Sequence, residues 1–156
     1  MTLPAPSDLI ERSHVSDWLE IDAEHLAAFS RGSYLEPDRV DLTISQNNAF
    51  GPTLVDGFLL LSLLVYFDFS EPFVSIEGGY GLNYGTDRVR FTTPVFVGDR
   101  VRLKRTVVEA EVKTPTRTLV TLDTELEVEK SGDTAMYARW LYLLIDRKAE
   151  EAGGAQ

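Results

Sequence analysis

The amino-acid sequence predicts an α+β domain in which an antiparallel sheet wraps around one long helix. Residues 53–67 are apolar almost without interruption, and a helix that is apolar on every face has to be buried. After this segment apolar and polar residues alternate, which is the pattern of half-buried strands. The chain of 156 residues has the size of a single domain and can bury a core without disulfides or metal.

Two segments before the buried helix are expected to flank it. A short amphipathic helix is predicted from Asp22, a suitable N-cap, to Phe29, because apolar residues recur there at helical spacing. Residues 30–52 are rich in Ser, Gly, Pro, Asp and Asn and are predicted to form a long irregular loop. Loops of this length inside a compact domain are usually functional, so this loop is expected to contribute to a site.

Five strands are predicted after the buried helix. They span residues 73–76, 88–91, 101–112, 117–128 and 135–145, with turns at 113–116 and 130–133. The glycine-rich residues 77–85 lack the pattern of a phosphate-binding loop, and bulges and a tight turn are expected there. Residues 1–15 and 147–156 are predicted to be peripheral tails of the one domain, 1–156. The exposed edge and open face of such a sheet favour a dimer.

Composition excludes several classes of site. The chain has no cysteine, which excludes disulfides, thiolate metal sites and a cysteine nucleophile. His14 is expected to precede the fold and His25 to lie at the surface; two histidines are too few for a multi-histidine site, and no metal or cofactor is expected. The net charge of −10 disfavours nucleic-acid binding. No signal peptide or bilayer-spanning run is recognisable, so a cytoplasmic location without membrane partners is expected.

The start of the buried helix is a candidate binding site for a carbonyl group. The first amides of a helix have no intrahelical acceptor, and the helix dipole is positive there. Gly57 is predicted to donate its backbone N–H to a carbonyl oxygen, because its missing side chain lets a ligand approach closely. The alternative is that glycine only lets the helix pack closely on the sheet. Asp56 is either a general acid or base, or a helix cap without a chemical role.

Two motifs make the chain similar to a known family. Residues 50–57 read Phe-Gly-Pro-Thr-Leu-Val-Asp-Gly, and residues 94–99 read Pro-Val-Phe-Val-Gly-Asp. Together with the amphipathic helix and the long loop before them, they resemble the MaoC-like dehydratases, hotdog-fold enzymes related to (R)-specific enoyl-CoA hydratases. Asn-Tyr-Gly at 83–85 and Arg-Val-Arg-Phe at 88–91 are closest to the nodulation-protein-N branch of this family. The resemblance extends over residues 16–145.

The resemblance implies a hotdog fold, an antiparallel sheet wrapped around the long helix, with an active-site tunnel at the interface of a dimer. It also implies that the chain hydrates or dehydrates an acyl thioester. The thioester carbonyl would be bound at Gly57, and Asn83 and Tyr84 would line the substrate pocket.

The acid–base residues that are usual in this family are missing. Members of the family use an Asp and a His on the long loop, and these positions hold Tyr34 and Arg39 here; a shift of one residue does not restore the pair. A His that usually precedes the helix glycine is replaced by Asp56. Asp56, Tyr34 and Arg39 are therefore the predicted catalytic residues. The alternatives are an aromatic side chain that packs over the loop for Tyr34 and ion pairs that make the loop rigid for Arg39.

Six of the 15 basic residues lie within residues 88–105. One interpretation is a surface that binds the phosphates of coenzyme A or of a carrier-protein arm. The other interpretation is cross-strand pairing with the acidic residues of neighbouring strands, which also alternate along the chain.

Three functions are compatible with the sequence. The first is a MaoC-like lyase, a dehydratase or hydratase that uses a non-standard acid–base pair. Its substrate would be a β-hydroxy or α,β-unsaturated acyl thioester or a related carbonyl compound. The second function is a catalytically silent hotdog subunit that binds acyl thioesters or pairs with an active partner. The third is a specialised-metabolite cyclase or isomerase. The expected partners are a small-molecule substrate, free or as a coenzyme A or carrier-protein thioester, and a second chain in a homodimer or a hotdog heterodimer.

Overall fold

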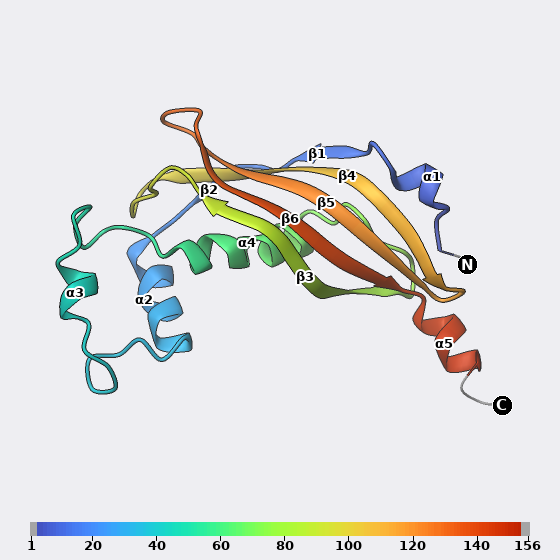
Figure 1. Cartoon of the computed structure of the whole chain (residues 1–156), viewed down its shortest axis with the longest axis horizontal. Coiled ribbons are helices and arrows are strands. Elements are labelled where there is room, and N and C mark those ends of the chain that lie inside the picture. The colour runs from blue at the N-terminus through green and yellow to red at the C-terminus, as the bar shows by residue number, and fades with distance from the viewer. Residues whose placement is uncertain (1–2, 154–156) are drawn as a thin grey trace.

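A six-stranded antiparallel sheet curves around helix α4 in the computed structural model, which describes residues 3–153 (Figure 1). The helices are α1 (Pro6–Leu9), α2 (Ala23–Gly32), α3 (Thr43–Gln46), α4 (Gly57–Ser70) and α5 (Arg147–Gly153). The strands are β1 (Ser13–Val15), β2 (Leu19–Glu20), β3 (Tyr80–Phe91), β4 (Arg100–Thr114), β5 (Arg117–Val128) and β6 (Thr134–Ile145). The strand order is β1-β4-β5-β6-β3, and β2 pairs with β4, so β3 forms one edge. The predicted α+β class is confirmed.

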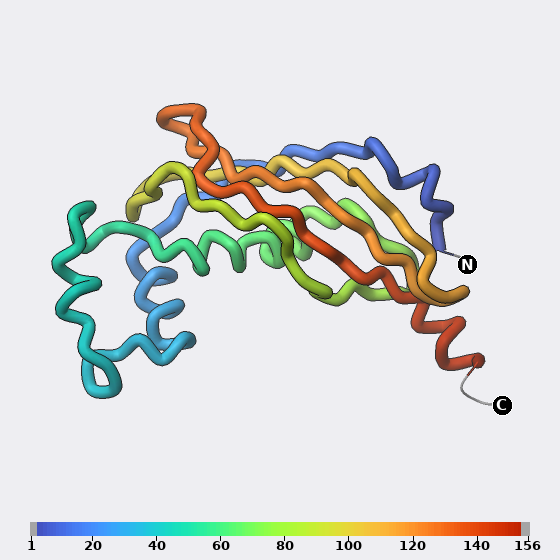
Figure 2. Tube along the Cα trace, in the orientation of Figure 1, coloured from blue at the N-terminus to red at the C-terminus, as the bar shows by residue number. Residues whose placement is uncertain are grey.

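Helix α4 packs one side against the sheet and leaves the opposite side uncovered (Figure 2). Its buried side chains are those of Leu59, Leu60, Leu64 and Phe67. On the opposite side, Phe58 and Phe69 are 68% and 82% exposed. The prediction that the whole helix is buried is therefore wrong for this side, because the sheet of a single chain covers only one face of α4.

Strands β4, β5 and β6 confirm the three long predicted strands to within two residues at each end. Strand β3 is longer than predicted, because it begins at Tyr80 and includes much of the glycine-rich segment. A register shift between Asn83 and Gly85 corresponds to an expected bulge. Gly81 is required in β3 because a Cβ atom there would lie 1.7 Å from the Tyr142 hydroxyl oxygen of the neighbouring strand.

Residues 73–76, predicted as a strand, form an irregular segment between α4 and β3. Phe73 and Val74 are nevertheless buried, with exposed fractions of 8% and 2%. The alternating apolar pattern of this segment thus reflects packing into the core rather than strand pairing.

The terminal segments contain more structure than predicted. Leu9 in α1 is 1% exposed and belongs to the core, and β1 pairs with β4, with His14 opposite Arg105. The prediction that His14 precedes the fold is wrong, because β4 takes β1 as a partner along its outer side. At the C-terminus, residues 147–153 form α5, and the Asp146 carboxylate accepts a hydrogen bond from the Ala149 amide at 3.0 Å. The outermost residues of both predicted tails, 1–2 and 154–156, lie outside the described part of the chain.

The basic residues at the start of β4 pair with two acidic residues at the end of β5, Glu127 within the strand and Glu129 just after it. Arg100 lies 2.9 Å from Glu129, and Arg102 and Lys104 lie 2.5 and 3.1 Å from Glu127. These contacts confirm the cross-strand pairing interpretation for this part of the basic cluster. Each of these partly exposed pairs contributes little to stability, because solvent screens the charges.

Candidate active site

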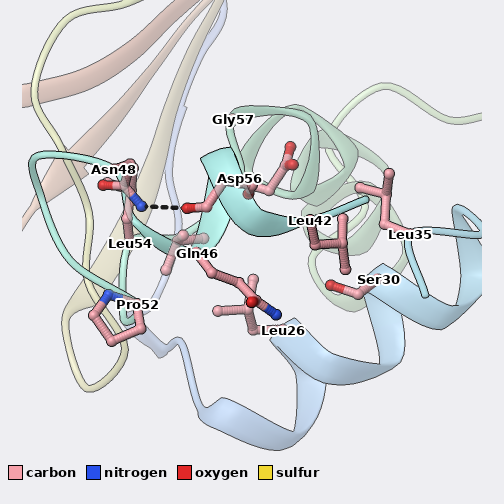
Figure 3. A pocket seen from close by; sticks show the side chains of 12 residues that line it. Leu26, Ser30, Leu35, Leu42, Gln46, Asn48, Pro52, Leu54, Asp56 and Gly57 are labelled. Carbon is pink, nitrogen blue, oxygen red and sulfur yellow. Dashed lines mark hydrogen bonds between the residues drawn. The ribbon is translucent and has the colours of Figure 1, made fainter. Parts of the chain in front are cut away.

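The start of α4 lies between two cavities. The first, of about 400 Å³, faces α2 and α3, and the second, of about 370 Å³, faces the end of β3. Gly57 lines both cavities, and Asp56 lines the first. Figure 3 shows the first cavity, which is surrounded by side chains from α2, α3 and the segment that leads into α4.

The segment before α4 is fixed by the turn at residues 94–99. Leu54 forms a β-bridge with Phe96, and the Val55 amide donates to the Val95 carbonyl at 2.8 Å. In the turn, Gly98 has a φ of +94°, a conformation that favours glycine. The helix therefore begins at Gly57, four residues later than predicted, because residues 53–55 are held by this turn.

Asp56 is the N-cap of α4. Its Oδ1 accepts a hydrogen bond from the Phe58 amide at 2.7 Å, which satisfies one of the free donors at the helix start. This observation confirms the helix-cap interpretation. The interpretation of Asp56 as a general acid or base stays open, because Oδ2 of the same carboxylate accepts no hydrogen bond from residues 3–153.

Gly57 combines a close packing contact with an amide that has no acceptor within residues 3–153. A Cβ atom at this position would lie 3.1 Å from three ring carbons of Phe91, tighter than an ordinary contact. The helix start therefore does pack closely on the sheet at this glycine, which does not decide whether the amide also binds a ligand. Within residues 3–153 the Gly57 N–H has no hydrogen-bond acceptor, so it remains free to bind a carbonyl oxygen at the positive end of the helix dipole.

Tyr34 and Arg39 lie together on the connection between α2 and α3, and neither lines the two cavities at Gly57. The Arg39 guanidinium lies over the Tyr34 ring, 5.3 Å from its centroid, and Arg39 Nε lies 3.2 Å from Glu36 Oε1. Arg39 thus makes one of the loop ion pairs that were predicted as the alternative to a catalytic role, the one with Glu36. Tyr34 is 66% exposed and has a φ of +62°, which is unusual for a residue other than glycine.

Asn83 and Tyr84 lie on the edge strand β3, outside both cavities at Gly57. Asn83 Oδ1 accepts a hydrogen bond from Trp140 Nε1 at 3.1 Å, whereas Tyr84 is 63% exposed. The six predicted site residues therefore form three pairs. Only Asp56 and Gly57 share a cavity at the helix start.

The first cavity contains polar side chains that sequence reasoning missed. Ser30 on α2 and Ser45 and Gln46 on α3 line it together with Asp56. Asn48 also lines it, but its amide is used to shape the turn, with Nδ2 donating to the Ser45 carbonyl at 2.8 Å. A polar residue in a long loop carries no sequence signal for the direction of its side chain, so only the folded chain brings these groups together.

Asp41 supports the loop rather than the cavity. Its Oδ1 accepts hydrogen bonds from the amide and the hydroxyl of Thr43, at 2.9 and 2.6 Å. These two hydrogen bonds lower the pKa of the Asp41 carboxyl below its usual range, because they stabilise the ionised form.

Neither histidine lines the cavities at Gly57. His25 is exposed on α2, as predicted, and hydrogen bonding to Asp22 at 2.8 Å raises its pKa. Residues 3–153 contain no group of three His, Asp or Glu side chains that could hold a metal ion. Over the same residues, no helix is long and apolar enough to cross a membrane.

Comparisons with known proteins agree on one family. The family model of the MaoC like domain matches residues 13–130. Nodulation protein N of Rhizobium leguminosarum bv. viciae is 30% identical over 145 residues, which cover 89% of this chain and 88% of that protein. The 3-hydroxyacyl-thioester dehydratase Z of Mycobacterium tuberculosis is 30% identical over 135 residues, or 82% of this chain and 85% of that protein.

A solved structure gives the same result for the fold. An (R)-hydratase from A. caviae involved in PHA biosynthesis matches with a TM-score of 0.63 and 25% identity, over 85% of this chain and 94% of that chain. The predicted hotdog fold is thereby confirmed. On the family model and these relatives together, the chain belongs to the MaoC-like hydratase and dehydratase family.

Proposed function

We propose that the chain is a lyase that interconverts 3-hydroxyacyl and trans-2-enoyl thioesters, with the thioester carbonyl bound by the Gly57 amide. The observation that carries this proposal is that the Gly57 N–H at the start of α4 has no acceptor within residues 3–153, while Gly57 lines two cavities. During dehydration the proton on the α-carbon is removed and negative charge develops on the carbonyl oxygen. A fixed N–H donor and the helix dipole stabilise that charge most strongly in the transition state.

Asp56 is the proposed proton carrier. Its carboxylate removes the α-proton, a second group donates a proton to the β-hydroxyl group, which leaves as water, and the double bond forms between the α- and β-carbons. Asp56 then passes its proton to solvent and the second group is reprotonated from solvent, so the net products are the enoyl thioester and one water molecule. Hydration is the reverse of these steps. The cap on the Phe58 amide occupies only Oδ1 of Asp56, so the same residue can hold the helix start and exchange a proton through Oδ2.

The proton added to the leaving hydroxyl group has two candidate sources, at different locations: a side chain of the long loop, or a water molecule in the cavity. Tyr34 and Arg39 are the predicted side chains, and a movement of the loop would be needed to bring either into the cavity that Asp56 lines. Gln46 already lines this cavity and can orient a water molecule or the substrate hydroxyl through its amide group. The two locations predict different effects of substitution.

We expect Gln46→Leu to lower the turnover number about 10-fold or more, and Tyr34→Phe to lower it less, because only Gln46 lines the cavity in this structure. Steady-state kinetics with a 3-hydroxyacyl thioester would measure both effects. The opposite order would show that the loop closes and that Tyr34 is the proton donor. Tyr66→Phe is a matched control, since the Tyr66 side chain on α4 is 46% exposed and lines neither cavity.

A silent thioester-binding subunit is the second candidate function. It is favoured by one observation: Asp56 is the single titratable side chain among those that line the cavities at Gly57. Such a subunit would bind acyl thioesters without turnover and would work beside an active partner chain. A cyclase or isomerase acting on a free carbonyl compound would use the same Gly57 amide.

We also propose that the chain forms a dimer through β3 and the uncovered side of α4. The edge strand exposes Leu82 and Tyr84, at 48% and 63%, and α4 exposes Phe58 and Phe69. Unpaired edge strands and large apolar surfaces are usually covered by another chain. The ligand would then lie between the two chains, and the cytoplasm remains the predicted location.

The dimer is tested by sedimentation velocity on the wild type and on the double variant Leu82→Lys/Tyr84→Lys. We expect a dimeric wild type and a monomeric variant, because two buried, unpaired charges would oppose association. Val112→Lys, at a 54% exposed position on β4, is the matched control and should remain dimeric. A monomeric wild type would contradict a homodimer and favour pairing with a second hotdog chain.

A further inference from the structure

Cavities lie along α4 from its start toward its C-terminal end. Two more cavities, of about 340 and 290 Å³, follow α4 on the side of β3 and β6. They share Val65, Asn83 and Trp140 and therefore adjoin one another. We refer to these two cavities together as the groove. The Phe58 and Phe91 rings, with centroids 6.2 Å apart, lie between this groove and the cavity beside Gly57.

One face of α4 carries residues that line the cavity at Gly57 and both cavities of the groove. Gly57, Leu61, Leu64 and Asp68 follow the spacing i, i+4, i+7, i+11, which aligns them along one side of a helix. The eleven residues from Gly57 to Asp68 correspond to about 16 Å along the helix axis. A medium-length acyl chain attached to a carbonyl at Gly57 would reach the end of this groove.

The far end of the groove is polar, although most of its walls are not. Asp68 and Tyr142 both line the last cavity, together with the rings of Phe69, Tyr80 and Trp140. The Asp68 side chain is 17% exposed, and burial raises the pKa of its carboxyl despite the opposing effects of Tyr142 and Arg105.

Arg105 accounts for part of this polarity but not for all of it. Its side chain is buried, and Nη1 lies 3.5 Å from Asp68 Oδ1, which is long for a hydrogen bond. Nη2 donates to the Glu71 carbonyl instead and lies 3.3 Å from His14 Nδ1. An ionised carboxylate can accept about four hydrogen bonds, so Asp68 keeps acceptor capacity beyond its contacts with Arg105 and Tyr142.

We propose that this groove binds the acyl chain of the substrate, and that Asp68 and Tyr142 bind a hydrogen-bond donor, a hydroxyl or an ammonium group, at the far end of that chain. The inference rests on the proposed function, because it takes the thioester carbonyl to be bound at Gly57. Asp68 accepts a hydrogen bond from either group. The faces of Trp140 and Tyr142 add cation–π attraction for an ammonium group only.

Binding of unreactive ligands tests this proposal without any turnover. The probes are the pantetheine thioesters of decanoic, 10-hydroxydecanoic and 10-aminodecanoic acid, which lack a 3-hydroxyl group and a double bond. Isothermal titration calorimetry on the full chain would give their dissociation constants. At least one polar-ended thioester is expected to bind about tenfold more tightly than the decanoyl compound, a difference of about 1.4 kcal/mol.

Three variants locate the effect. Tyr142→Phe and Asp68→Asn should each remove most of this preference, and Asp68→Asn should affect the ammonium compound more than the hydroxyl compound. The double variant Arg105→Met/Asp68→Leu removes both charges together, so it leaves no unpaired buried charge, and it should prefer the decanoyl compound. Tyr66→Phe, which removes a hydroxyl group from the same helix outside the groove, should leave all three constants unchanged.

The possible failures are distinct. If all three thioesters bind the wild type equally, the polar end of the groove does not recognise the ligand, and this inference is wrong while the proposed function stands. If none of the three binds, thioester binding itself is wrong, and both proposals are overturned.

Discussion

Replacing Asp56 with asparagine is expected to lower the turnover number about 100-fold or more without changing the fold. The Asn side chain can still accept the hydrogen bond from the Phe58 amide that caps α4, at 2.7 Å in the wild type. Because Asn and Asp are equally good caps, the free energy of unfolding should change by less than about 0.5 kcal/mol. An amide cannot exchange the substrate proton, so turnover and stability separate in this variant.

Asp56→Ala is the companion of this experiment. It removes the cap as well as the carboxylate and should cost about 1 kcal/mol of stability in addition to turnover. Thermal unfolding followed by circular dichroism would measure the loss of stability. If Asp56→Asn keeps the wild-type turnover number, Asp56 is only a helix cap and the proton carrier is another residue.

Replacing Gly57 with alanine is expected to lower kcat/KM about 100-fold, comparable to the loss of one oxyanion donor. The new methyl group would stand beside the amide that binds the thioester carbonyl, so the substrate is held too far away for the hydrogen bond. The same methyl group would lie 3.1 Å from the Phe91 ring, which is a second way for the substitution to act. The two causes have to be separated.

A double variant separates them. Gly57→Ala/Phe91→Leu removes the crowded ring, and Phe91→Leu alone is the control. If access to the amide is the cause, the double variant stays as slow as Gly57→Ala in steady-state kinetics. Recovery of the wild-type kcat/KM in the double variant would show that Gly57 serves packing alone, contrary to the proposed carbonyl site.

The elements with the strongest local patterns were predictable from the sequence. Strands β4 and β5 alternate apolar and polar residues along much of their length, β6 is a long run rich in apolar residues, and polar turns separate the three strands. Residues 73–76 share the alternation over four positions, which is too short to distinguish a strand from an irregular buried segment. Leu9 and β1 were missed because their burial depends on the outer side of β4, far away in the sequence.

The candidate site was predictable only where it is continuous in the chain. Asp56 and Gly57 are neighbours at a helix start, so the motif itself places them together. Tyr34 and Gln46 lie on a long connection whose folding depends on its contacts with the rest of the chain, so their positions relative to the cavity could not be deduced. The role proposed for Asp68 had no signal in the sequence, because one carboxylate near the end of an apolar helix resembles an ordinary exposed helix residue.

The central claim is that α4 binds a thioester carbonyl at Gly57 and that Asp56 transfers the substrate proton. The most direct test is to mix purified wild type and Asp56→Asn with trans-2-enoyl and 3-hydroxyacyl thioesters and to follow the enoyl absorbance. The account predicts turnover by the wild type and a loss of about 100-fold in the variant with an unchanged Tm. Equal turnover by both proteins, or no turnover of any thioester by the wild type, would contradict it.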